Sequence, residues 1–148
     1  MTAVHIVLGV ALIAVNAVAA VLGWLQWRGI AAGSPSWFWR LLRAGQALLM
    51  VEAVDGAILV LAGHDLPSLH LIYGLVPLGV SFVAEQLRLA AATAVLDQHG
   101  LEGRADLELL SPGEQSELVQ AIMRRELGVM AAAAAVVALL GVRAAGLL

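Results

Sequence analysis

The stretch AVHIVLGVALIAVNAVAAVLGWLQW, residues 3–27, carries no charged side chain and is long enough to cross a lipid bilayer as a helix. A hydrocarbon core of about 30 Å needs about 20 apolar residues per helix. Three more stretches meet this requirement, at residues 38–62, 69–94 and 127–147. Because lipid offers backbone groups no hydrogen-bond partner, each stretch should be helical. The sequence therefore predicts an all-α, integral membrane four-helix bundle in which residues 1–148 form a single domain.

The composition agrees with this class. Hydrophobic residues make up 61% of the 148 residues and charged residues 13%, whereas a soluble domain is about 45–50% apolar and about 25% charged. The chain has no cysteine, which excludes disulfides, thiolate ligands and iron–sulfur clusters. No basic patch with interleaved aromatic residues occurs, so nucleic acid is not a predicted partner. The first stretch lacks a charged n-region and a cleavage site, so we expect a retained span and not a signal peptide.

The placement of arginine predicts the orientation in the cell membrane. The first and third connections between the stretches carry arginine, whereas the second connection, residues 63–67, carries none. The positive-inside rule therefore places the first and third connections in the cytoplasm and both termini outside. The inner-side arginines are Arg28, Arg40, Arg43, Arg88, Arg104, Arg124 and Arg125. The four tryptophans cluster at the same inner level as an interfacial belt and are Trp24, Trp27, Trp37 and Trp39.

Capping signals mark the helix ends. Ser34-Pro35 and Ser111-Pro112 each place an N-cap serine before a proline at the first helical position. Ser111-Pro-Gly-Glu114 is also a capping box, so the fourth helix should begin near residue 112, before it enters lipid. Gly100 is the predicted stop of the third helix, near Gln98.

The third and fourth helices should therefore extend into the cytoplasm beyond their apolar parts. The extensions, about 88–98 and 112–126, are expected to pack on each other as a short hairpin. Residues 101–110 are acidic and are expected to form a loop. Glu85, close to Arg88, is expected to make an ion pair at the inner interface.

Two of the apolar stretches open with the same pattern. The first begins His5-Ile-Val-Leu-Gly9 and the third begins His70-Leu-Ile-Tyr-Gly74. Helices one and three run in the same direction, so both histidines lie near the outer surface at similar depth. Ionisable side chains within membrane helices are costly and are functional candidates by default.

We interpret His5 and His70 as the axial ligands of a non-covalent b-type haem. Neighbouring helices lie about 8–10 Å apart, a gap that two imidazoles on one iron can bridge. Gly9 and Gly74 lie one turn deeper on the same face, where a missing side chain lets a flat macrocycle approach. Arg143, level with the histidines, is the predicted partner of the haem propionates. Alternatively, both histidines are interfacial and the glycines serve close helix packing.

The other histidines are weaker candidates. His64 lies in the short outer loop and is expected to be a loop residue. A zinc site formed by His5, His64 and His70 is a further alternative, since three histidines can bind catalytic zinc, but the loop makes its geometry awkward. His99 precedes Gly100 and suits the negative end of a helix dipole.

Two carboxylates lie within the second helix. Glu52 and Asp55 are three residues apart and share one helix face. Counted inward from the outer loop at about 1.5 Å per residue, they are expected about 13–18 Å deep. Asn16 and Ser81 are expected at a similar depth, so the four residues predict a polar layer in mid-bilayer. Its role is either a proton relay beneath the haem or interhelical hydrogen bonding.

The second helix, the outer loop and the start of the third helix resemble the haem A synthase family. The stretch VEAVDGAILVLAG, residues 51–63, is followed by Pro67 and His70. Haem A synthases contain helix pairs of the form Gln-x-x-x-Gly-x-x-x-x-Leu-x-Gly, then a short outer loop and a histidine that opens the next helix. Each half of such a protein is a four-helix bundle in which histidines on two alternating helices bind haem near the outer face.

The resemblance covers residues 5–75 and implies His5 and His70 as axial ligands, with Gly56 and Gly63 as packing glycines. The chain departs from the family in three ways. It contains only one such half, Glu52 replaces the glutamine, and no glutamate lies one turn before either histidine. The resemblance thus implies haem binding and argues against haem A synthesis.

These observations predict a cytochrome-b-like membrane protein that passes electrons or holds haem for a partner. The alternative is a cofactor-free accessory or assembly subunit of a membrane complex, whose histidines and carboxylates only lock the bundle. A small proton-coupled transporter is disfavoured because no helix is visibly broken around a site. The lipid bilayer and haem are the predicted partners. Any catalysed reaction, a respiratory or other membrane complex, and a homodimer are left open.

Overall fold

The computed structural model describes residues 3–30, 35–65, 67–101 and 104–147, and the regular elements within these ranges are all helical. They are α1 (Ala3–Trp27), α2 (Ser36–Leu61), α3 (Ser68–Gln98), α4 (Arg104–Leu109) and α5 (Pro112–Ala144). Four of them, α1, α2, α3 and α5, are long and apolar enough to cross a membrane. The predicted helical class and the four predicted apolar helices are therefore confirmed.

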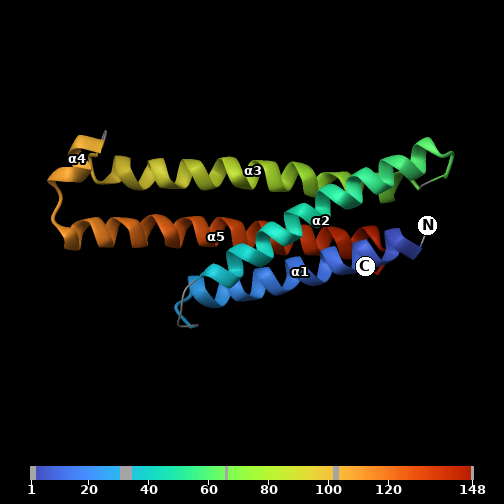
Figure 1. Cartoon of the computed structure of the whole chain (residues 1–148), viewed down its shortest axis with the longest axis horizontal. Coiled ribbons are helices and arrows are strands. Elements are labelled where there is room, and N and C mark those ends of the chain that lie inside the picture. The colour runs from blue at the N-terminus through green and yellow to red at the C-terminus, as the bar shows by residue number, and fades with distance from the viewer. Residues whose placement is uncertain (1–2, 31–34, 66, 102–103, 148) are drawn as a thin grey trace.

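Helix α5 is the central element of the packing. It lies along both α1 and α3, whereas α2 packs mainly on α1 and makes few contacts with α3 and α5. Figure 1 shows α2 crossing the molecule obliquely, with the N and C labels at the same end. Helices α3 and α5 continue side by side beyond the α1–α2 hairpin (Figure 1), and Val95 and Leu118 are buried within this continuation. The predicted pairing of 88–98 with 112–126 is thus present.

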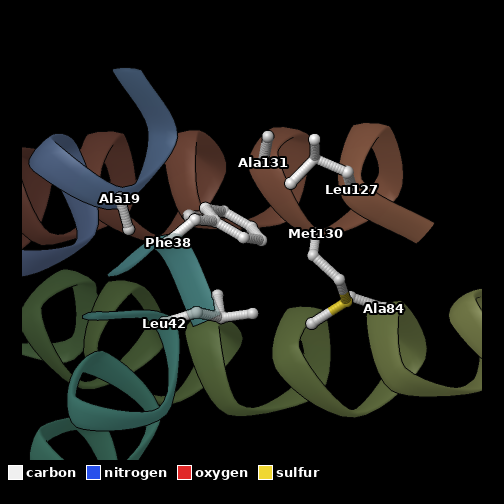
Figure 2. Close-up of a cluster of buried hydrophobic side chains, with 8 residues drawn as sticks. Ala19, Phe38, Leu42, Ala84, Leu127, Met130 and Ala131 are labelled. Carbon is white, nitrogen blue, oxygen red and sulfur yellow. The ribbon is translucent and has the colours of Figure 1, made fainter. Parts of the chain in front are cut away.

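The main core lies where α2 begins, against α5 and α3. Figure 2 shows the Phe38 ring beside Ala131 of α5, and the Met130 side chain reaching Ala84 of α3. A side chain at Gly23 would place its Cβ 2.6 Å from the Phe38 ring, so α1 needs glycine there. Small residues let membrane helices approach closely, and this core follows that rule.

The outer surface of the long helices is apolar. Large hydrophobic side chains such as Val7, Val18, Val54 and Phe82 are at least half exposed. A soluble protein rarely exposes so much contiguous apolar area. This surface is consistent with contact with lipid hydrocarbon.

An ionic cluster joins α2, α3 and α5 on the side of the molecule away from the termini. Glu85 of α3 accepts hydrogen bonds from Arg43 and Gln46 of α2 and from Arg88, whose Nε lies 2.9 Å from Glu85 Oε2. Arg88 Nη1 also lies 3.6 Å from Glu126 of α5. The predicted pair of Glu85 and Arg88 is confirmed as one part of this larger cluster, which contributes to the limited contact between α2 and α3.

The helix ends agree with most of the capping signals. Gly100 follows α3 with a φ of 67°, a left-handed conformation that favours glycine. His99 Nδ1 lies 2.8 Å from the Val95 carbonyl, as suits a histidine at a helix C-terminus. Ser34 lies outside the described residues, and α2 begins after Pro35 with no side-chain cap.

The loop predicted for residues 101–110 is wrong in part, because α4 forms there. This helix has only 6 residues, too few to show a clear apolar periodicity. Gln115 of α5 bonds to one carbonyl of α4 and to one just after it: its Nε2 donates to the Leu107 and Leu110 carbonyls, each at 3.0 Å. A side chain of the following helix therefore stabilises the turn.

The capping box at Ser111 gives a direct test of the α5 boundary. The Ser111 hydroxyl accepts from the Glu114 backbone N–H, and the Glu114 side chain accepts from the Ser111 backbone N–H. Ser111→Ala should lower the free energy of unfolding by about 1 kcal/mol and speed amide hydrogen exchange in residues 112–116. Ser116→Ala, within the same helix, is the control. Equal exchange in both variants would show that the box does not hold the helix end.

Candidate functional site

His5 and His70 meet at the end of the molecule where α1 and α3 both begin. Their Nε2 atoms are 3.4 Å apart and their ring centroids 5.7 Å apart. Bond lengths of about 1.3 Å place each imidazole atom about 1.2 Å from the ring centre, so the centroid distance nearly equals the Nε2 separation plus two ring radii. The rings therefore point at each other end to end. The structure thus brings together the two histidines that the sequence pattern singled out.

The other nitrogen of the His70 ring, Nδ1, is hydrogen-bonded to the backbone of α5. His70 Nδ1 lies 2.9 Å from the Ala144 carbonyl oxygen. A carbonyl oxygen can only accept, so Nδ1 carries the hydrogen. In the neutral ring, Nε2 then presents its lone pair to His5.

The His5 ring is also hydrogen-bonded through its Nδ1 atom, here to carboxylates of α2. His5 Nδ1 lies 3.0 Å from Asp55 Oδ2 and 3.3 Å from Glu52 Oε1, and the residue is only 6% exposed. Ionised carboxylates only accept, so this Nδ1 also carries a hydrogen. The Nε2 lone pairs of the two neutral rings would then face each other. A cation between the rings would satisfy both lone pairs; if a carboxyl is protonated instead, His5 Nε2 carries the hydrogen and donates to His70 Nε2.

Nearby glycines make room for the cluster itself. A Cβ at Gly9 would lie 3.2 Å from Glu52 Oε1, and a Cβ at Gly56 would lie 3.8 Å from the His5 ring. The space expected beside Gly9 for a macrocycle is therefore taken by the Glu52 carboxylate, which corrects that expectation. Beside Gly74, by contrast, a Cβ would meet no atom within 4 Å. The second Glu52 oxygen, Oε2, is buried and has no hydrogen-bond partner among the described residues.

The predicted mid-bilayer polar layer does not form as one layer. Glu52 and Asp55 bind His5 near the start of α1, because α2 crosses α1 obliquely and counting along its axis overestimates their depth. Asn16 lies further along α1, where its amide donates to the Leu12 carbonyl at 2.9 Å and packs against Gly45. Ser81 is half-buried on α3 and makes no recorded hydrogen bond within the described ranges.

The remaining candidates lie at the edge of the cluster. His64 is exposed in the connection between α2 and α3 and belongs to no group of metal-ligand side chains in the described part of the chain. The one such group there consists of His5, Glu52 and Asp55. The three-histidine zinc arrangement is therefore not assembled. Arg143 adjoins Ala144, and its guanidinium carbon lies 5.5 Å from the centre of the Tyr73 ring.

Sequence reasoning missed the Ala144 carbonyl and Tyr73 as members of this region. Every residue carries a carbonyl, so no sequence signal marks the one that binds His70. Comparison with known proteins adds no assignment, because no protein-family model, curated protein or solved structure matches the chain. The likeness to haem A synthases rests on the quoted residues alone and stays a prediction.

Proposed function

We propose that this chain is a membrane b-type haem protein with His5 and His70 as axial ligands. The observation that carries the proposal is the end-to-end placement of the two rings, each with Nδ1 bonded to an oxygen. Histidines that bind metals almost always donate the other ring N–H to a carboxylate or backbone carbonyl, which fixes the tautomer and the ring orientation. Asp55 and the Ala144 carbonyl provide these two partners.

The end-to-end alignment of the two rings fits a tetrahedral ion poorly. Tetrahedral zinc with bonds of about 2.0–2.1 Å holds two nitrogens about 3.3 Å apart at a bent angle, so the rings would not align end to end. The two histidines would hold the haem between their Nε2 atoms, which lie 3.4 Å apart here, and the rings would have to move apart to admit it. The open space beside Gly74 favours access of the haem to the histidines from the α3 side.

In this proposal, each residue of the cluster has its own role in haem binding. His5 and His70 would hold the iron, Asp55 and Glu52 would orient the His5 ring, and Arg143 would bind a propionate. Bound haem supplies one-electron chemistry. The negative charge of the carboxylates beside His5 would favour the oxidised iron.

We further propose that the four long helices form a membrane bundle with the histidine end outside and the arginine-rich end in the cytoplasm. The arginine asymmetry supports this orientation, and the N and C labels at one end are compatible with an even number of crossings (Figure 1). The α3–α5 continuation then lies in the cytoplasm.

Optical spectra of the full chain test the haem proposal. Protein expressed with ample haem and purified in mild detergent should show a Soret band, and sharp α and β bands on reduction, as expected for a six-coordinate low-spin b-type haem. A preparation without Soret absorbance, and without reconstitution by added haemin, overturns the proposal.

A cofactor-free accessory or assembly subunit is the second candidate. The 3.4 Å Nε2 separation lies within hydrogen-bonding reach, so one proton shared by the rings would also satisfy both lone pairs. The carboxylates of Asp55 and Glu52 would then stabilise the imidazolium, and the cluster would lock α1, α2 and α3 together. Absent Soret absorbance, combined with stability that falls when both histidines are replaced, supports this candidate.

The contact between Asp55 and His5 predicts that a change at Asp55 weakens haem binding without abolishing it. Asp55→Asn should weaken haem retention by about 10- to 100-fold, as is typical when the partner of a metal-bound histidine is lost. It should also raise the haem midpoint potential, because a negative charge near the iron is removed. Haem transfer to an acceptor apoprotein and redox titration measure the two effects. Asp65→Asn, in the exposed connection after α2, is the control; identical behaviour of both variants would remove Asp55 from the site.

A further inference from the structure

The opposite end of the molecule contains a cavity that the histidine cluster does not involve. It has a volume of about 850 Å³ and lies between the end of α1, the start of α2 and the middle of α5. Ligand pockets in proteins commonly measure about 300–1,000 Å³. Its walls include the indole rings of Trp27 and Trp39 and the side chain of Leu127. Trp27 is seated against α5, where a Cβ at Gly128 would lie 2.9 Å from its Nε1.

Three arginines line this cavity. They are Arg28 at the end of α1, and Arg124 and Arg125 on α5. All three are exposed, and within the described ranges none of them forms an ion pair with a carboxylate. Arg125 donates to Gln98 at 3.1 Å, and Arg28 lies over Trp24 and Trp27. Among the described residues, no acidic side chain lines the cavity, so its lining favours an anion.

A ligand of this cavity combines a negative charge, which the arginines can bind, with an apolar part that the tryptophans can contact. We propose that this cavity binds the head group of an anionic phospholipid, with the phosphate among the three arginines and the apolar part of the lipid against the tryptophans. The cavity lies where the apolar helices end and tryptophans gather, which is the level of lipid head groups. Arginine binds phosphate through paired N–H groups, and basic pockets between membrane helices bind such head groups. The proposal rests on the membrane location and is independent of the haem.

Lipid binding to the full chain in detergent micelles tests the proposal. The probes are phosphatidylglycerol, phosphatidylcholine and soluble glycerol phosphate, and native mass spectrometry counts bound molecules. We expect saturable binding of one phosphatidylglycerol, with phosphatidylcholine and glycerol phosphate both much weaker. Binding of glycerol phosphate as tight as that of the lipid, or equal binding of the two lipids, overturns the proposal.

Arginine variants distinguish lipid binding in this cavity from non-specific attraction between lipid and protein charges. Each arginine near an anionic surface contributes about a five-fold increase in affinity, so Arg124→Gln should weaken phosphatidylglycerol binding by about five-fold. Arg40→Gln removes the same charge at the same end, but Arg40 lies over Trp37 outside the cavity. Both side chains are exposed, so neither change affects the core. An equal loss in the two variants, or no loss in Arg124→Gln, contradicts a defined site.

Discussion

Replacing His70 by alanine should remove the low-spin spectrum of the proposed haem. The His70 ring faces His5 at 3.4 Å and is held by the Ala144 carbonyl, so its loss leaves the opposite ligand alone. The purified variant should be five-coordinate or haem-free. Added imidazole should restore the six-coordinate spectrum where haem is retained, because it fills the space of the missing ring. His5→Ala should act in the same way from the other side.

His64→Ala is the matched control for these variants. His64 is exposed in the connection between α2 and α3, so its removal should leave the spectrum unchanged. Equal spectral loss in all three variants would point to a three-histidine metal site, in disagreement with the geometry. An unchanged spectrum in His70→Ala would show that the haem binds elsewhere.

Phe38→Ala should cause the largest loss of stability among single core substitutions in the part of the chain described. Phe38 is 0% exposed and lies between α1, α2 and α5 (Figure 2). Truncating a buried phenylalanine costs about 3–5 kcal/mol, since a cavity remains. Unfolding by a denaturing detergent, followed by circular dichroism, measures the change.

Phe82→Ala provides the comparison, because it makes the same chemical change on the outer face. Phe82 is 67% exposed, and exposed substitutions usually change stability by about 0.5 kcal/mol or less. Similar losses in the two variants would mean that the Phe38 cluster is not the core of the folded protein.

The sequence predicts the helices and the histidine pair for related physical reasons. Apolar length sets each span, and the alternating direction of successive spans brings His5 and His70 to the same end. The position of Glu52 and Asp55 could not be derived in this way. It depends on the angle at which α2 crosses α1, which is set by close contacts such as that between Gly23 and Phe38. No periodicity in the chain encodes that angle.

The glycines show the same limit. Gly9 was expected to leave room for a ligand because a helical glycine exposes its backbone, but the structure places the Glu52 carboxylate there. A pattern identifies a position without a side chain; it does not identify the neighbour that uses the space. Capping signals were more reliable, as at Ser111, because both partners lie within one helical turn.

The contact between His70 and the Ala144 carbonyl has a consequence for biosynthesis. Ribosomes make α5 last among the described helices, yet α5 provides both the surface on which α1 and α3 pack and the acceptor that fixes the His70 tautomer. A nascent chain that ends before residue 144 contains both histidines, but it lacks the Ala144 carbonyl that fixes the His70 ring. Under the proposed function, haem would therefore be bound only after the last helix has been made and packed against α1 and α3.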